Sequence, residues 1–145
     1  MYKRQASDRF ATALSKVGVK KGDKVALFLP NCPQFAIAYY GALKAGAIVT
    51  AMNPLYKSRE VNFQLKDSGA ETIVALDMLY PVVEQAKRDT ALKNIIITFI
   101  ADYLPPIKRV LGKLLGKVKT LKVPKGPGIY YLTDCLLYTS PSPRD

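Results

Sequence analysis

The sequence predicts an α/β fold in which a mostly parallel sheet is flanked by helices. Short apolar runs rich in β-branched residues alternate with segments of helical period, and the connections between them are short. The predicted strands are residues 25–29, 47–51, 72–76 and 94–100. Brief, almost wholly apolar runs are typical of strands that are covered on both faces, as in parallel sheets. Their regular alternation with helices favours one layer of strands between helices.

The predicted helices carry residues that are typical of helix ends. We expect them over residues 7–17, 33–45, 58–66 and 77–88. The predicted N-terminal residues are Asn31 with Pro33, Ser58 and Asp77, and the predicted C-terminal glycines are Gly18, Gly46 and Gly69. Short polar side chains accept hydrogen bonds from the first free N–H groups of a helix, and glycine adopts the left-handed conformation that ends one.

Composition excludes several kinds of site. The chain has 145 residues, a formal net charge of +11, no His and two Cys. The lack of His excludes His-dependent catalytic triads and His-liganded metal centres. Cys32 and Cys135 cannot form a CxxC pair, and a reducing, cytoplasmic compartment is the expectation. No apolar run approaches the roughly 20 residues of a membrane helix.

The two ends of the chain resemble translated transposase-adaptor DNA. One short DNA element, read in opposite orientations, can encode both residues 2–5 and residues 135–139, and its continuation can encode residues 140–145. We therefore expect residues 1–5 and 135–145 to be adaptor artefacts and residues 6–134 to be the genuine part. A natural Pro/Ser-rich tail is the alternative.

The turn after the first predicted strand argues against a dinucleotide site. A dinucleotide-binding fold needs glycines there, so that backbone N–H groups can approach a pyrophosphate. This chain has the turn Pro30-Asn31-Cys32-Pro33, whose prolines lack that donor. Cys32 itself is expected to be a small buried filler, although a reactive thiol at a helix start is the alternative.

A basic segment follows the predicted sheet. Between Tyr103 and Thr133 there are seven Lys or Arg and no acidic residue, and apolar residues recur at helical spacing over 107–119. Each basic group near an anionic membrane contributes about 1 kcal/mol, so this segment could make a peripheral membrane contact. A solvated surface helix is the alternative. Nucleic-acid binding is not expected, because no aromatic residue lies between Tyr103 and Tyr130 to stack on bases.

Three segments carry a resemblance to a known family. They are Val25-Ala-Leu-Phe-Leu-Pro-Asn31, the stretch from Gly41 through Leu43-Lys-Ala-Gly46 to Asn53-Pro-Leu-Tyr56, and Asp67-Ser-Gly-Ala-Glu-Thr-Ile-Val74. In this order and spacing they resemble the N-terminal region of adenylate-forming, AMP-binding enzymes, and within these the long-chain fatty acid CoA ligases. The resemblance implies a parent enzyme that uses ATP and Mg2+ to convert a fatty acid to an acyl-adenylate and then, with coenzyme A, to acyl-CoA.

No catalytic, cofactor-binding or metal-binding residue is assigned to this chain. The family's phosphate loop, its acidic Mg2+ residue and its catalytic Lys would lie downstream of the residues present. Tyr138-Thr139-Ser140 imitates the start of the phosphate loop, but Pro141 stands where a glycine must let the backbone turn. The segment Asn53–Tyr56 is interpreted as scaffold, and contact of this segment with substrate is the alternative.

The resulting interpretation is a truncated N-terminal subdomain of an AMP-forming fatty acyl-CoA ligase that is inactive by itself. Two alternatives are a ligase for other acyl or aryl acids and a non-enzymatic, basic lipid-surface module. A natural stop codon soon after Asp134 would favour the module. A cytoplasmic location, with peripheral contact to the inner membrane face, is expected. The acyl chain length and the oligomeric state stay open.

Overall fold

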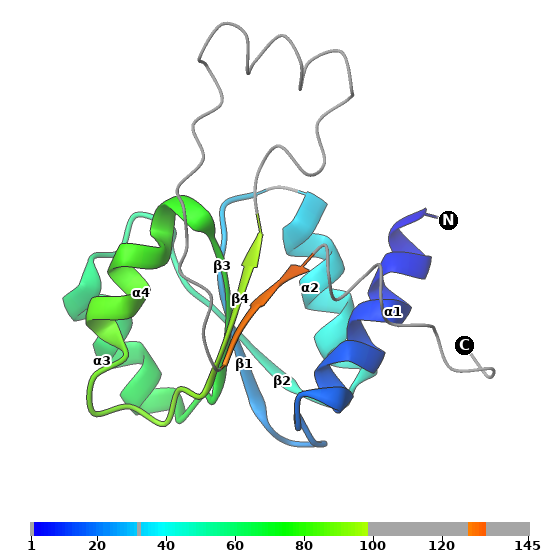
Figure 1. Cartoon of the computed structure of the whole chain (residues 1–145), viewed down its shortest axis with the longest axis horizontal. Coiled ribbons are helices and arrows are strands. Elements are labelled where there is room, and N and C mark those ends of the chain that lie inside the picture. Colours follow the sequence, from blue (N-terminus) through cyan, green and yellow to red (C-terminus); the bar gives the residue numbers. More distant parts are fainter. Residues whose placement is uncertain (1, 32, 99–127, 133–145) are drawn as a thin grey trace, which may run out of the picture.

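The structure is a computed structural model that describes residues 2–31, 33–98 and 128–132. Cys32, the basic segment 107–119 and the segment 133–145 lie outside these residues. Within them, the predicted α/β class is confirmed (Figure 1).

A five-stranded sheet forms the centre of the fold, and every neighbouring pair of strands is parallel. The strands lie in the order β2-β1-β3-β4-β5, which is an order of doubly wound sheets. They are β1 (Lys24–Phe28), β2 (Ile48–Ala51), β3 (Thr72–Leu76), β4 (Asn94–Thr98) and β5 (Ile129–Tyr131). Strands β1 and β3 are thus central, and β2 is one edge.

Helices cover both faces of this sheet. Figure 1 shows α1 (Tyr2–Lys16) and α2 (Pro33–Lys44) on one face, and α3 (Ser58–Ser68) and α4 (Tyr80–Ala86) on the other. A 3-10 turn, η1 (Asp77–Leu79), leads from β3 into α4. The four helices that the sequence predicts are therefore all present.

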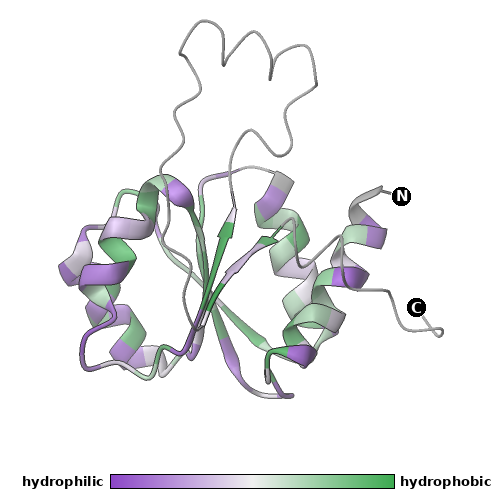
Figure 2. Cartoon of the chain, viewed as in Figure 1, coloured by the Kyte–Doolittle hydropathy of each residue, from purple (hydrophilic) through white to green (hydrophobic). Residues whose placement is uncertain are grey.

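The alternation of side chains along each strand creates two separate cores. One core lies against α1 and α2 and includes Phe10, Leu14, Val25, Leu27, Ile37 and Val74. The other lies against α3 and α4 and includes Ala26, Phe28, Val61, Leu65, Ile73 and Val83. Figure 2 shows the strands as mainly hydrophobic and the helices as mixed. Because successive residues of a strand point to opposite faces, one apolar run supplies both cores.

Strand β5 was not predicted. The sequence analysis assigned no strand after residues 94–100. Instead, Ile129–Tyr131 pairs in parallel with β4, and the Ile95 N–H donates to the Gly128 carbonyl at 2.7 Å. Gly128 has a φ of +81°, and a side chain there would collide with the Lys93 carbonyl. Three residues are too few to show an alternation of apolar and polar side chains, so this strand can be identified only from its pairing with β4.

Two predicted helix caps were wrong. Ser58 is the first residue of α3, and Lys57 is the N-cap, whose backbone N–H donates to Glu60 Oε2 at 3.1 Å. Asp77 begins the 3-10 turn rather than capping a helix to residue 88. At α3 the Glu60 side chain accepts the N–H of the N-cap residue, and at residue 77 a 3-10 turn replaces a directly capped helix start, so neither Ser58 nor Asp77 is an N-cap.

Other helix boundaries shifted by a few residues. Helix α1 begins at Tyr2 rather than residue 7, since Lys, Arg, Gln and Ala before that point are strong helix formers. Helix α4 ends at Ala86, where the Lys87 carbonyl accepts a hydrogen bond from the Thr90 hydroxyl at 2.6 Å. Gly69 does end α3 as predicted, with a φ of +70° and its N–H donating to the Leu65 carbonyl. Within the described residues, no helix is long and apolar enough to cross a membrane.

Helices α1 and α2 touch through a glycine, which yields a test of the fold. A Cβ at Gly41 would lie 2.7 Å from Phe10 Cδ2 and 3.0 Å from the Ser7 carbonyl oxygen. We expect Gly41→Val to force α1 away and to lower the free energy of unfolding by about 1–3 kcal/mol. Chemical denaturation measures this change.

The control for this substitution is Leu43→Ala, at a side chain of α2 that is 47% exposed. Exposed substitutions of this kind change stability by about 0.5 kcal/mol or less. Equal midpoints for Gly41→Val and the unmodified chain would contradict the close approach of the two helices.

Candidate functional site

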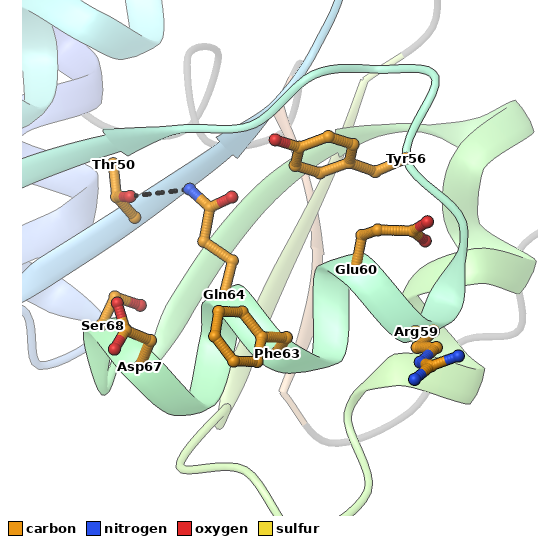
Figure 3. A pocket seen from close by; sticks show the side chains of 8 residues that line it. All are labelled: Thr50, Tyr56, Arg59, Glu60, Phe63, Gln64, Asp67 and Ser68. Atoms are coloured by element: carbon orange, nitrogen blue, oxygen red, sulfur yellow. Dashed lines mark hydrogen bonds between the residues drawn. The ribbon is translucent and has the colours of Figure 1, made fainter.

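A groove of about 610 Å3 lies between the edge strand β2 and helix α3. Figure 3 shows its lining side chains, which come from β2, from the loop after it and from α3. They are Thr50, Tyr56, Arg59, Glu60, Phe63, Gln64, Asp67 and Ser68. The groove combines two aromatic rings with both signs of charge.

Gln64 joins the two walls of the groove. Its Nε2 donates to Thr50 Oγ1 at 3.1 Å and to the Ala51 carbonyl at 3.2 Å (Figure 3). Strand β2 pairs with β1 on its inner side, so its outer side is the edge of the sheet. An edge strand presents unpaired backbone groups, and here Gln64 occupies one of them.

The loop between β2 and α3 is a tight turn built by Asn53. Its Oδ1 accepts a hydrogen bond from the Leu55 N–H at 2.9 Å, and its carbonyl accepts one from the Tyr56 N–H at 3.0 Å. Such local bonds are typical of asparagine in turns. The interpretation of residues 53–56 as scaffold therefore has a structural basis, although Tyr56 also lines the groove.

The side chains of the groove present hydroxyl, amide and charged groups and two aromatic rings. The groove holds neither His nor Cys, and the part of the chain that the structure describes has no group of three or more potential metal ligands. Burial, with smaller contributions from Glu84 and Tyr131, raises the pKa of Tyr80, which lies on α4 outside the groove. This shift in the pKa of Tyr80 therefore does not point to chemistry in the groove.

A second candidate site lies at the carboxyl ends of the strands. Three polar residues there are almost fully buried: Gln34 at the start of α2, Asp77 after β3, and Thr98 at the end of β4. Thr98 Oγ1 has no hydrogen-bond partner among the described residues. Doubly wound sheets bind ligands at this end. The sequence analysis treated Asp77 as a cap and did not select Gln34 or Thr98, although a polar residue that ends an apolar strand is a readable signal.

Several residues discussed from sequence contribute nothing to either site. Pro30 and Asn31 follow β1 and do not line the groove. Cys32 and residues 138–140 lie outside the described part of the chain. The groove was missed because its walls are separate segments that only the tertiary fold brings together.

Comparisons with known proteins agree with this fold. The chain is 40% identical over 129 residues to a long-chain-fatty-acid–CoA ligase of Bacillus subtilis. This match covers 88% of this chain and 23% of that protein. It is 39% identical over 137 residues to the long-chain-fatty-acid–CoA ligase of Escherichia coli O157:H7. That match covers 94% of this chain and 24% of the ligase. The chain thus spans about a quarter of the length of these relatives.

Solved structures show the same architecture. The fold matches an anthranilate CoA ligase with a TM-score of 0.73 at 18% identity, over 94% of this chain and 22% of that one. It matches a long-chain-fatty-acid-CoA ligase from Archaeoglobus fulgidus with a TM-score of 0.64 at 28% identity, over 66% and 19%. The sequence profile described as "AMP-binding enzyme" matches residues 3–128. By this match and these relatives, the chain belongs to the AMP-binding enzyme family.

Proposed function

We propose that this chain is the N-terminal part of an AMP-forming long-chain-fatty-acid–CoA ligase. The observation that carries the proposal is 36–40% identity over nearly the whole chain to ligases of that name from several bacteria. The parent would activate a fatty acid with ATP to an acyl-adenylate and release pyrophosphate. The thiol of coenzyme A would then attack the acyl carbon, and AMP would leave.

The role of this stretch in the parent is structural. Its parallel sheet and two cores supply a rigid layer on which other parts of the enzyme can be built. Two observations support this role: no glycine-rich turn follows β1, and the described residues contain no group of three or more potential metal ligands. Groups that bind ATP, Mg2+ and coenzyme A are therefore proposed for other parts of the parent, and the chain alone is proposed to be inactive.

Other acids are the main alternative within the family. A 4-coumarate–CoA ligase of Pinus taeda is 47% identical to this chain, but over 70 residues, or 48% of it. The long-chain ligases match 83–94% of the chain. We therefore favour a long-chain fatty acid as the substrate, because the sequence similarity to the long-chain ligases extends over most of the chain.

A chimeric enzyme tests this proposal. The matching 129 residues of the Bacillus subtilis relative are replaced by residues 6–134 of this chain. If these residues form the scaffold of such a ligase, the chimera is expected to release AMP from ATP, palmitate and coenzyme A at a rate within about tenfold of the unmodified relative. A coupled AMP assay measures the rate.

Two controls accompany the chimera. The unmodified relative sets the full rate, and the 145-residue chain alone is expected to give only the background rate. A soluble, folded chimera with no palmitate-dependent AMP release would contradict the proposal, as would palmitate-dependent AMP release by the chain alone.

We also propose a peripheral contact of this protein with the inner face of a membrane from the cytoplasm. The support is the sequence of residues 107–119, where Lys108, Arg109, Lys113 and Lys117 accompany apolar residues at helical spacing. Electrostatic attraction to anionic lipid would place the enzyme beside a substrate that partitions into the bilayer.

Vesicle co-sedimentation tests the membrane contact. We expect the chain to sediment with vesicles that contain about 30% anionic lipid, and Lys113→Glu with Lys117→Glu to reduce the bound fraction severalfold by changing the charge by −4. The same substitution at Lys20 and Lys24, which lie outside residues 107–119 of the sequence, is the matched control for net charge. Unchanged binding after substitution at 113 and 117 would overturn the contact.

A further inference from the structure

Helix α3 presents an unusual outward surface. Its exposed residues are Arg59, Glu60, Phe63, Lys66 and Asp67, here called the α3 outer face. Val61 and Leu65, on the opposite side of the helix, are fully buried in the core. Phe63 is 71% exposed, so a large aromatic ring stands in the middle of a charged surface (Figure 3). A ring of this size contributes most when a partner covers it.

The charges on this face are sorted by sign. Arg59 and Lys66 are seven residues apart, which is close to two helical turns, so both lie on one side of Phe63. Glu60 and Asp67 are also seven residues apart and lie on the other side. The α3 outer face therefore has a basic flank and an acidic flank with an aromatic ring between them.

These charges are not engaged in ion pairs within the fold. In the part of the chain that the structure describes, the ion pairs are Lys44 with Asp8 and Lys93 with Glu71. The carboxylate of Glu60 accepts a hydrogen bond from the Lys57 backbone N–H. Among the described residues, the two cations and two anions of the α3 outer face thus form no ion pair, and Glu60 also caps the start of α3 through this hydrogen bond.

We propose that the α3 outer face is an interface for a second copy of this chain. In a two-fold arrangement with the two α3 helices parallel, the basic flank of one helix faces the acidic flank of the other. Arg59 then lies beside Glu60 of the partner subunit, and Lys66 lies beside Asp67 of the partner subunit. The two copies of Phe63 meet at the centre, where the axis relates equivalent positions.

The orientation follows from the charge pattern. In an antiparallel pair related by a two-fold axis, each flank would face its own kind, so that acid would meet acid and base would meet base. Like charges in close contact are unfavourable, whereas the parallel pair gives four opposite-charge contacts. The face carries no net charge of its own, so two chains of charge +11 can meet here with less repulsion than elsewhere.

The strength of this dimer is limited by its size. One face of an 11-residue helix buries less than the roughly 1,600 Å2 of a typical stable interface. We therefore expect a weak, concentration-dependent dimer of the 145-residue chain, which sedimentation velocity can follow. Phe63→Ser is expected to lower the association constant about tenfold or more while leaving the circular dichroism spectrum unchanged.

Charge variants test the flanks independently of folding. Arg59→Glu with Lys66→Glu makes both flanks acidic, and Glu60→Lys with Asp67→Lys makes both basic. Each variant alone is expected to be monomeric, and an equimolar mixture of the two is expected to form a heterodimer. Restored association in the mixture cannot arise from unfolded chains, so it supports the interface directly. Two variants that stay monomeric in the mixture would overturn it.

The orientation has its own test. A variant with Arg59→Glu, Glu60→Arg, Lys66→Asp and Asp67→Lys exchanges the two flanks and is expected to dimerise by itself. Parallel helices predict that this variant does not form heterodimers with the unmodified chain, because like flanks would then meet. Preferred heterodimers would overturn the parallel arrangement. An unmodified chain that is monomeric at the highest concentration reached would overturn the proposal altogether, and would fit a face that another part of the parent covers.

Discussion

The structure depends on the burial of strands β1 and β3 on both faces. Along β1, Val25 and Leu27 enter the core against α1 and α2, whereas Ala26 and Phe28 enter the core against α3 and α4. Such a strand has no solvent face, so it is stable only when helices cover both sides of the sheet. The helices that connect the parallel strands therefore have to pack on both faces of the sheet before β1 and β3 are fully buried. The edge strand β2, with Ile48 exposed, lies outside this constraint.

This constraint explains why the functional candidates lie at the margins. The groove forms where the edge strand β2 meets α3, and the buried polar residues Asp77 and Thr98 stand where strands end. The interior of the sheet is filled with apolar side chains and offers no room for chemistry. This arrangement supports the proposal that the stretch contributes rigidity to a larger enzyme and offers its exposed surfaces to other parts of that enzyme or to a second copy.

The sequence predicted the fold best where a hydrophobic pattern extended over several residues. Strands β1, β3 and β4 are mostly apolar, and β1 and β3 were predicted within one residue of their observed ends. Strand β4 begins where it was predicted, and the last two residues predicted for it lie outside the described part of the chain. The short strand β5 was missed because its pairing with β4, and the close approach of Gly128 to Lys93, are tertiary features. The cap of α3 was misplaced because the helix start lies one residue earlier than expected, at Lys57, whose N–H donates to the Glu60 carboxylate. The groove and the α3 outer face could not be predicted, since they depend on which side of α3 the core occupies.

The central claim is that β1 and β3 are held by two cores while β2 and β5 are edges. Amide hydrogen exchange of the 145-residue chain, resolved by residue, tests it most directly. The account predicts the slowest exchange at residues 25–28 and 73–76, and exchange at least about tenfold faster for the outward N–H groups of β2. Equal and rapid exchange along all of the strands would contradict the account.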